Sequence, residues 1–399
     1  RIAGAVGRLD TGIALPFIGQ PVQGMSGFAM NRAEDGAYYV LTDNGFGSKR
    51  NSPDAMLFFH KMMPDFETGT VARRDTIFLS DPDRKVPFRI AYEGTESRYL
   101  TGADFDTESI QVIDDEVFIG DEFGPYIIRA GLDGVVREVY ATELDGKELH
   151  GPDTYSVYVP ASAGSDYQVQ RSGGYEGMAL QPGTGLLWAM LEKPILLEGG
   201  ETEGPFLRVI AFDPEAGEWT GESGKFQLAD GATAIGDFNF IDETRALVIE
   251  RDNGEGDAAQ ACAEDATDTS DCYPNPARVK NIVLVDMSDV SEDGFVRRLG
   301  HVDLLDIADP TASRSMAWPP QRAPLPSRSS PSRTWFGWTR PTSSWPTTTT
   351  CRSRAGACRG RPRTTSSSCC RCPSCSRPSD LTGCGTRKGA LAGRPFHLS

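Results

Sequence analysis

Residues 106–125 of this chain read DTESIQVIDDEVFIGDEFGP. An acid, Glu108, opens a β-rich run, and 13 residues later a second run ends in another acid, Asp121. Looser copies of this pattern, with spacings of 13 to 17 residues, pair Ser26 with Asp43, Glu176 with Glu192, and Asp237 with Glu250. A repeat with insertions predicts a β-propeller, in which equivalent strand ends from successive blades converge and gather acids that are distant in sequence. For any one copy, the alternative is an acid that only caps a turn.

Short β-rich runs recur along the first 310 residues, while helical periodicity is nearly absent. Turn signals such as Asp133-Gly134, Asp145-Gly146 and Asp213-Pro214 separate the runs, as hairpin-built sheets require. The predicted strands include residues 37–41, 117–119, 186–190, 207–212, 246–249 and 282–285. We therefore predict an all-β fold, a β-propeller of five or six blades, over residues 1–310. The 43 glycines and 27 prolines agree with a turn-rich globule.

The charge of the chain is divided unevenly. Residues 311–399 contain 15 Lys and Arg and one acid, so the net charge is about +14 there and about −30 before it. A body this acidic should repel nucleic acid and anionic membranes, and it offers many oxygen ligands to hard cations. The alternative is a solvated or salt-adapted surface.

Two cysteines, Cys262 and Cys272, bracket a polar loop and are the only ones before residue 311. Thiols placed in this way favour a disulfide and an oxidising compartment, so we predict a periplasmic or secreted protein. No run of about 18 apolar residues is present, which predicts no integral membrane segment. The chain opens at Arg1 without a signal peptide, which suggests a mature or truncated form.

The tail, residues 311–399, is rich in Arg, Ser, Pro, Thr and Cys and has almost no aliphatic run that would form a strand. Such a segment is predicted to be disordered or translated out of frame. If the codons of residues 345–353 are read in a frame shifted by two nucleotides, the genetic code allows Ala followed by four residues drawn from Asn, Asp, His or Tyr. We therefore expect that a frameshift near Pro310 removed the last blade, which resequencing with an intact frame would contradict.

Five short motifs together resemble the phytase-like (esterase-like activity of phytase) family. They are residues 41–47 (LTDNGFG), 106–110 (DTESI), 120–125 (GDEFGP), 175–179 (YEGMA) and 250–253 (ERDN). The resemblance covers about residues 15–310 and implies an active centre of Glu and Asp side chains. Carried onto this sequence, it indicates Asp43, Glu108, Asp121, Glu122, Glu176, Glu192, Glu250 and Asp252. A further acid and an Asn-Asp-Asn stretch that usually end the family's domain are missing here, although the shifted frame would allow them.

Crowded carboxylates repel one another unless a cation compensates, and Ca²⁺ accepts six to eight oxygens in irregular geometry. We therefore predict a calcium site formed by the acids Asp43, Asp121, Glu122, Glu192, Glu250 and Asp252 together with Asn44. Few His residues and no His-x-His spacing disfavour zinc.

A hydrolase that acts on a small anionic ester, phosphoric or carboxylic, is the predicted function. Glu108 or Glu176 would accept a proton from the attacking water. Lys193 and Arg251 follow strand-end acids and would clamp an anionic substrate, unless they only form ion pairs with Glu192 or Glu250. Alternatives are a calcium-dependent lactonase-type propeller and a non-catalytic binding propeller with a structural ion. A catalytic serine is disfavoured, since no Gly-x-Ser-x-Gly motif is present.

Overall fold

The computed structural model describes residues 24–44, 47–154 and 167–307. In this part of the chain, four antiparallel sheets of four strands follow one another in chain order, with one additional two-stranded ribbon and no α-helix. The all-β prediction is confirmed. The predicted tail, residues 311–399, lies outside the described residues.

We name the four sheets blades 1 to 4 in chain order. Blade 1 consists of β1 (Met25–Phe28), β2 (Tyr38–Thr42), β3 (Phe58–Asp65) and β4 (Thr70–Phe78). Blade 2 consists of β5 (Thr107–Ile113), β6 (Glu116–Asp121), β7 (Tyr126–Gly131) and β8 (Val136–Ala141). Blade 3 consists of β11 (Tyr175–Leu180), β12 (Leu187–Leu191), β13 (Phe206–Asp213) and β14 (Glu218–Gln227). Blade 4 consists of β15 (Ala234–Phe240), β16 (Arg245–Arg251), β17 (Lys280–Val290) and β18 (Val296–Asp303). The ribbon is β9 (Glu143–Leu144) with β10 (Lys147–Glu148), and three 3₁₀ turns are η1 (Lys49–Asn51), η2 (Ala258–Gln260) and η3 (Leu304–Asp306).

Each predicted strand run falls on a strand of the structure, because apolar residues dominate both faces of these segments. β9 and β10 are joined by Asp145-Gly146, whose φ angles of 54° and 72° are those of a type I′ turn. The Asp-Gly turn signal in the sequence is thus confirmed at this position.

Successive blades pack face to face through apolar cores. Alternate residues of a strand point to opposite faces of its sheet. On β6, Val117 and Ile119 therefore enter the core shared with blade 1, while Phe118 enters the core shared with blade 3. A third core, which includes Met190 and Phe238, lies between blades 3 and 4.

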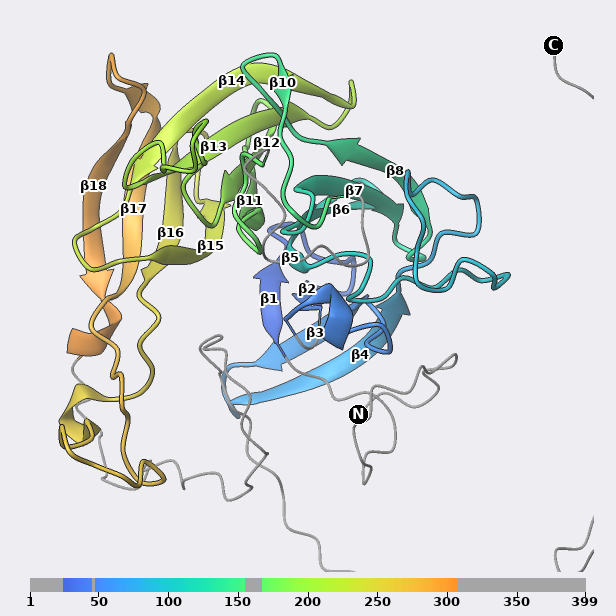
Figure 1. Cartoon of the computed structure of the whole chain (residues 1–399). Coiled ribbons are helices and arrows are strands. Elements are labelled where there is room, and N and C mark those ends of the chain that lie inside the picture. The colour runs from blue at the N-terminus through green and yellow to red at the C-terminus, as the bar shows by residue number, and fades with distance from the viewer. Residues whose placement is uncertain (1–23, 45–46, 155–166, 308–399) are drawn as a thin grey trace, which may run out of the picture. The chain divides into compact units, whose positions relative to one another are not determined.

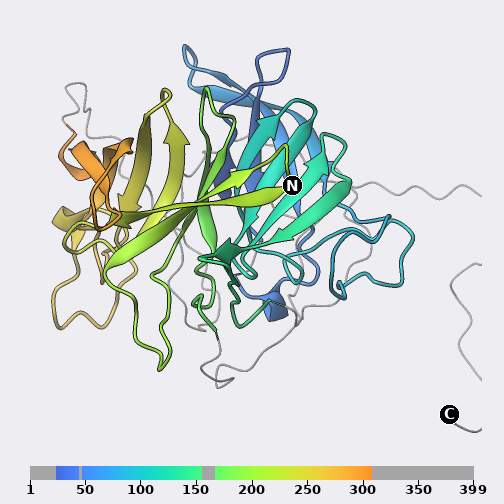
Figure 2. The ribbon, with the colours of Figure 1, turned by 90° about the horizontal axis from the view of Figure 1, so that it is seen from above.

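The first strands of the four blades contact one another: β5 contacts β1 and β11, and β15 contacts β11 and, at its margin, β1 (Figure 1). Figure 2 shows the same sheets turned by 90°, from the blue strands of blade 1 to the orange strands of blade 4. Four-stranded sheets packed face to face with their first strands together are the blades of a β-propeller.

The sequence predicted five or six blades, whereas the described residues contain four. The prediction counted a last blade that was expected to be lost, and the two long connections of the described residues, 79–106 and 252–279, contain only isolated bridges and 3₁₀ turns and add no further blade. The predicted loss of a last blade after residue 310 concerns residues outside the described part of the chain.

The connection 252–279 carries the predicted disulfide. Cys262 and Cys272 are bonded, with their Cα atoms 4.9 Å apart, and the neighbouring Tyr273 exchanges backbone hydrogen bonds with Cys262 and Gln260. The bond closes a loop at the end of blade 4. Among the described residues, no helix has the length and apolar character needed to cross a membrane.

A buried histidine makes the stability of the fold depend on pH. His60 on β3 is fully buried, with Nδ1 2.9 Å from Oγ1 of Thr76. Burial, assisted by the charge of Arg73, lowers the pKa of His60 to about 4. The unfolded chain binds this proton near pH 6.5, so acidification below that value favours unfolding until the folded state is protonated as well.

We expect the free energy of unfolding to fall by about 2–3 kcal/mol between pH 7 and pH 4.5 on account of this residue alone. In urea unfolding, the decrease in the free energy of unfolding between pH 7 and pH 4.5 should be smaller by that amount in His60→Gln than in the wild type. His301→Gln, which replaces an exposed histidine on β18, is the matched control. An equal acid loss in the wild type and in His60→Gln would contradict this assignment.

Candidate active site

Each blade opens with a β-bulge at the same place. The pairing register of the first strand with the second shifts between Met25 and Gly27, Thr107 and Ser109, Tyr175 and Gly177, and Ile235 and Asp237. The extra residue is therefore Ser26, Glu108, Glu176 or Gly236. A bulge re-aims the side chain of the extra residue, and in blades 2 and 3 that side chain is a buried glutamate.

A second set of equivalent positions lies at the end of the second strand of each blade. The residues that pair with the residue directly before each bulge are Thr42, Asp121, Leu191 and Glu250. The next residues along the chain are Asp43, Glu122, Glu192 and Arg251. The repeat predicted from the sequence aligned Asp121 and Glu250 with Asp43. This alignment is wrong by one residue, because Glu122 in blade 2 and Arg251 in blade 4 hold the position of Asp43. Asp237 was also predicted one residue too late, since the extra residue of the bulge in blade 4 is Gly236.

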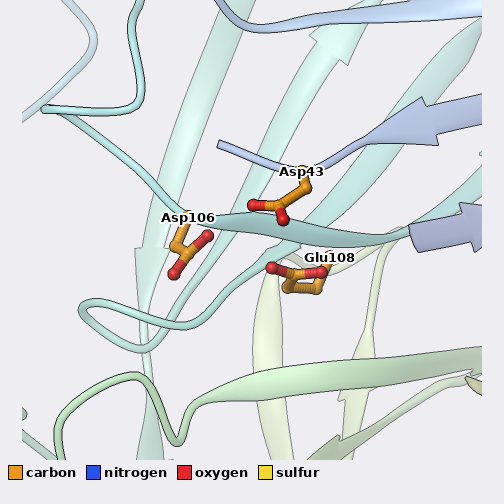
Figure 3. A group of neighbouring side chains, drawn as sticks. All are labelled: Asp43, Asp106 and Glu108. Atoms are coloured by element: carbon orange, nitrogen blue, oxygen red, sulfur yellow. The ribbon is translucent and has the colours of Figure 1, made fainter. Parts of the chain in front are cut away.

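Five carboxylates gather where blades 1, 2 and 3 meet, and we call them the carboxylate cluster. One oxygen each of Asp43, Asp106 and Glu108 lie within 4.8 Å of one another, and the side chains point into a shared space (Figure 3). One oxygen each of Glu108, Glu122 and Glu176 form a second such group. Glu108 belongs to both groups, so it is the centre of the cluster.

Small residues allow the strands to approach closely enough to form this cluster. A Cβ on Gly174 would lie 2.6 Å from Cα of Glu122, and one on Gly27 would lie 2.9 Å from the carbonyl oxygen of Glu108. The carbonyl oxygen of Gly174 also accepts the backbone N–H of Glu176, at 3.2 Å, and of Glu192, at 2.7 Å. Gly174 therefore brings acids of blades 2 and 3 into one place.

Asp106 was not predicted as a site residue from the sequence, although it is the first residue of the motif 106–110. Asp106 is fully buried directly before β5. Its backbone N–H donates to Oδ1 of Asp121 at 2.8 Å, and its carbonyl oxygen accepts the N–H of Glu122 at 2.9 Å. The spacing Asp106-x-Glu108 at the start of a strand is the signal that would have indicated it.

Asp121, a predicted calcium ligand, lies next to the cluster but uses both oxygens for backbone bonds. Oδ1 accepts the N–H of Asp106 and Oδ2 accepts the N–H of Gly124 at 2.7 Å. Burial raises the pKa of Asp121 to about 6, although these N–H donors and the charge of Lys49 oppose the shift. In the structure, Asp121 therefore fixes the turn that carries Glu122.

Lys49 is a buried cation beside this region and was not singled out from the sequence. The side chain of Lys49 is almost wholly buried, with Nζ 5.3 Å from the ring centre of Phe88 and 5.2 Å from that of Phe123. Burial lowers the pKa of Lys49, and the charges of nearby acids, Asp121 first, act against that shift. No sequence pattern joins Lys49 to these rings, because they come from distant segments.

The two cationic side chains predicted to bind substrate, Lys193 and Arg251, lie at one side of the cluster, where both pair with Glu192. Nη2 of Arg251 is 2.9 Å from Oε1 of Glu192 and 3.8 Å from Oε1 of Glu176. Nζ of Lys193 lies 3.2 Å from Oε2 of Glu192 and also donates to the carbonyl oxygens of Arg171 and Ser172. Glu192 is thus held by two cations, and Arg251 reaches from blade 4 to an acid of the cluster.

Three further predicted residues lie in other surroundings. Glu250 is fully buried and bonds Arg298, Asn281 and the N–H of Ala229. Asp252 pairs with Lys280 at 3.0 Å and accepts backbone N–H groups of the 252–279 connection. The side-chain amide of Asn44 exchanges two hydrogen bonds with the backbone of Gly47. Glu250 and Asp252 therefore belong to neither group of the carboxylate cluster, while Asn44 directly follows Asp43 and stays a predicted ligand.

The fold and these acids together define the class: an all-β propeller with a buried carboxylate cluster where its blades meet. The family model for the phytase-like family, described as esterase-like activity of phytase, matches residues 20–320. The chain belongs to this family. No curated protein matches the chain significantly.

Among solved structures, the chain is similar to Saccharomyces cerevisiae Sqt1, with 9% identity over 69% of this chain and 63% of that chain and a TM-score of 0.30. It is also similar to a protein described as a 6-phosphogluconolactonase from Bacteroides uniformis, with 13% identity over 74% and 76% of the two chains and a TM-score of 0.29. A protein described as a glucose dehydrogenase from Thermus thermophilus has 12% identity over 71% and 84% of the two chains and a TM-score of 0.27. The chain spans less than two thirds of Sqt1, and at these TM-scores the likenesses carry no argument about function.

Proposed function

We propose that this chain is a calcium-dependent hydrolase that acts on a small anionic ester. The observation that supports the proposal is the carboxylate cluster, in which two groups of three acids share Glu108. Membership of a family described as having esterase-like activity supports the reaction type. The finer assignments, calcium and the anionic ester, rest on the chemistry of the residues.

The donor set fits a hard divalent cation. All five members of the cluster offer carboxylate oxygens, and no His or Cys belongs to either group among the described residues. Carboxylates this close repel one another strongly in a buried site, so a bound cation stabilises the arrangement. Ca²⁺ suits the site because it accepts many oxygens without strict geometry.

The cation would be held by the cluster, with Glu108 between the two groups. When bound, Ca²⁺ polarises an ester or phosphoryl oxygen. The chain's own residues supply the remaining functions: Glu108 or Glu176 accepts the proton that the attacking water loses. Arg251 and Lys193, both held by Glu192, provide positive charge for an anionic substrate.

The disulfide supports a location in which thiols are oxidised. A bonded Cys262–Cys272 pair persists in the periplasm or outside the cell and is rarely kept in a reducing cytosol. We therefore extend the proposal to a periplasmic or secreted enzyme. Detection of both cysteines as free thiols in protein isolated from its native source, under alkylating conditions, would contradict this extension.

The proposal is tested by assaying the full chain on a phosphomonoester, a phosphodiester, a carboxylic ester and a lactone, each with calcium and with excess chelator. Calcium-dependent turnover of an anionic ester is the expected result. Turnover of the lactone alone would favour a lactonase-type propeller. A calcium-dependent rise in melting temperature without any turnover would indicate a binding propeller with a structural ion, and no response to calcium at all would contradict the site itself.

Arg251→Met tests the proposed role of the cationic side. We expect kcat/KM for the anionic ester to fall by about 10- to 100-fold, mainly through KM, because a charge-assisted contact to the substrate is worth roughly 1.5–3 kcal/mol. Arg245→Met removes an arginine from the exposed end of the same strand and is the matched control. An equal loss of activity on an anionic ester and on a neutral one would indicate a structural role for Arg251 instead.

A further inference from the structure

A lysine is buried beside the carboxylate cluster. Lys49, in the 3₁₀ turn η1, is 4% exposed, and a lysine is almost never buried to this extent without a compensating charge. Arg98, the other buried cation of the described residues, bonds Asp81 directly at 2.8 Å. Nζ of Lys49 instead lies near the rings of both Phe88 and Phe123, where its charge acts on several acids at once.

The two rings connect this lysine to the backbone that carries the cluster. Phe123 directly follows Glu122. Phe88 packs on Phe105, with ring centres 5.3 Å apart, and Phe105 directly precedes Asp106. The lysine is therefore held beside two members of the cluster by contacts that do not depend on their charges.

The acids whose charges act on Lys49 are all buried, so water does little to stabilise them. They are Asp121, Asp153, Asp104 and Asp106. Asp153 pairs with a cation of its own, Arg171. The positive charge of Lys49 therefore compensates mainly the other three, one of which, Asp106, belongs to the cluster.

We propose that Lys49 is the internal counter-cation of the carboxylate cluster, which stabilises the metal-free site and weakens calcium binding. This role rests on the proposed function, since it concerns the cation that the cluster would hold. Like charges repel strongly in a buried site, so a fixed ammonium beside the cluster must oppose the binding of a divalent cation. By reciprocity, bound calcium must reduce what Lys49 contributes to stability.

The test replaces Lys49 in the full chain with Met, which removes the charge and keeps an unbranched side chain beside the two rings. In Lys49→Met, titration calorimetry should show calcium binding about tenfold tighter than in the wild type. In excess chelator the melting temperature should fall by about 5 °C, and in saturating calcium by only about 2 °C, because tighter binding restores part of the lost stability. A residue that served only packing would lose stability in both states and would not tighten calcium binding.

Two variants control for the charge. Lys49→Arg keeps it and should leave calcium affinity within about threefold of the wild type. Lys61→Met makes the same change in net charge, and Lys61 also lies over a ring, that of Tyr39 at 5.8 Å. It should change calcium affinity by less than about twofold, because the charge of a partly exposed lysine is screened by water and salt.

Calcium affinity that is unchanged or weaker in Lys49→Met, or equally tightened in Lys61→Met, would overturn this role and leave the calcium site in place. A wild type that binds no calcium would instead overturn the proposed function, and this role with it. If Lys49→Met unfolds in chelator, the double variant with Asp106→Asn removes one charge of each sign and should fold there. Failure of both to fold would assign Lys49 to packing and contradict its role as a counter-cation.

Discussion

Glu108→Gln is expected to weaken calcium binding by about 100-fold, roughly 2.7 kcal/mol, because the substitution removes the one carboxylate that both groups of the cluster share. Turnover of the ester should fall by about 10³-fold, since a proposed proton acceptor is lost together with cation affinity. Titration calorimetry with calcium and the ester assay measure the two effects separately.

The same substitution should stabilise the metal-free protein. Glu108 is buried among Asp43, Asp106, Glu122 and Glu176, so removing one of these like charges relieves repulsion. We expect a gain of about 1 kcal/mol in the free energy of unfolding in excess chelator. Loss of function with a gain in metal-free stability distinguishes a ligand from a structural residue.

Glu116→Gln is the matched control for Glu108→Gln. Glu116 lies at the start of β6, paired with Arg129 at 2.5 Å and outside the cluster. It should change neither calcium affinity nor turnover by more than about twofold, as expected for a partly exposed ion pair. Unchanged calcium binding in Glu108→Gln would remove the cluster as the proposed cation site.

The strands and turns of blades 1 to 4 could be predicted from sequence because they depend on local chemistry. Runs such as residues 207–212 and 246–249 are β-rich and bounded by turn residues, and the structure has β13 and β16 there. The Cys262–Cys272 pair could also be predicted, since the two thiols bracket one loop. The number of blades could not be predicted from the sequence, because a long connection and a weak strand have similar compositions.

Four members of the carboxylate cluster, Asp43, Glu108, Glu122 and Glu176, were named from the sequence, but they could not be told apart there from neighbouring acids. Asp121 and Glu122 are adjacent acids, and the choice between them depends on the pairing of Thr107 with Asp121 after a bulge at Glu108. In blade 4 the same register gives Arg251 the position that Asp43 holds in blade 1. A bulge changes by one residue which side chains point to a given face of the sheet, and it has no fixed sequence signature. The sequence alone therefore could not decide which of two adjacent acids points into the site. The tail and its frameshift concern undescribed residues and stay predictions.

Glu250→Gln is the second large effect, and here the loss is expected in stability. Oε1 and Oε2 of Glu250 accept from Arg298 at 2.9 and 3.1 Å, and Arg298 also donates to the carbonyl oxygen of Gln227 in blade 3. Removing the charge leaves Arg298 without its carboxylate partner at the junction of blades 3 and 4. Glu250 is fully buried but Arg298 is 26% exposed, so the expected loss is about 2–3 kcal/mol, less than for a fully buried ion pair.

The pH dependence of this loss identifies its origin. Burial alone would raise the pKa of Glu250, but the bonds from Arg298, Ala229 and Asn281 outweigh it, and the pKa is lowered. A lowered pKa in the folded state means that the pair stabilises the protein above the carboxyl pKa of the unfolded chain, about 4.3, and that this stability is lost as the pH falls further. Urea unfolding should therefore show a large difference between the wild type and Glu250→Gln at pH 7 and a smaller one below pH 4.

The same variant decides between two roles for Glu250, because the sequence indicated a calcium ligand and the structure places it in an ion pair. With the protein still folded at low temperature, calcium affinity and turnover should stay within about twofold of the wild type, since Glu250 lies outside the carboxylate cluster. The double variant Glu250→Met, Arg298→Met should recover part of the lost stability, because it leaves no unpaired charge. Loss of calcium binding at unchanged stability would instead restore Glu250 as a ligand and place the site nearer to blade 4.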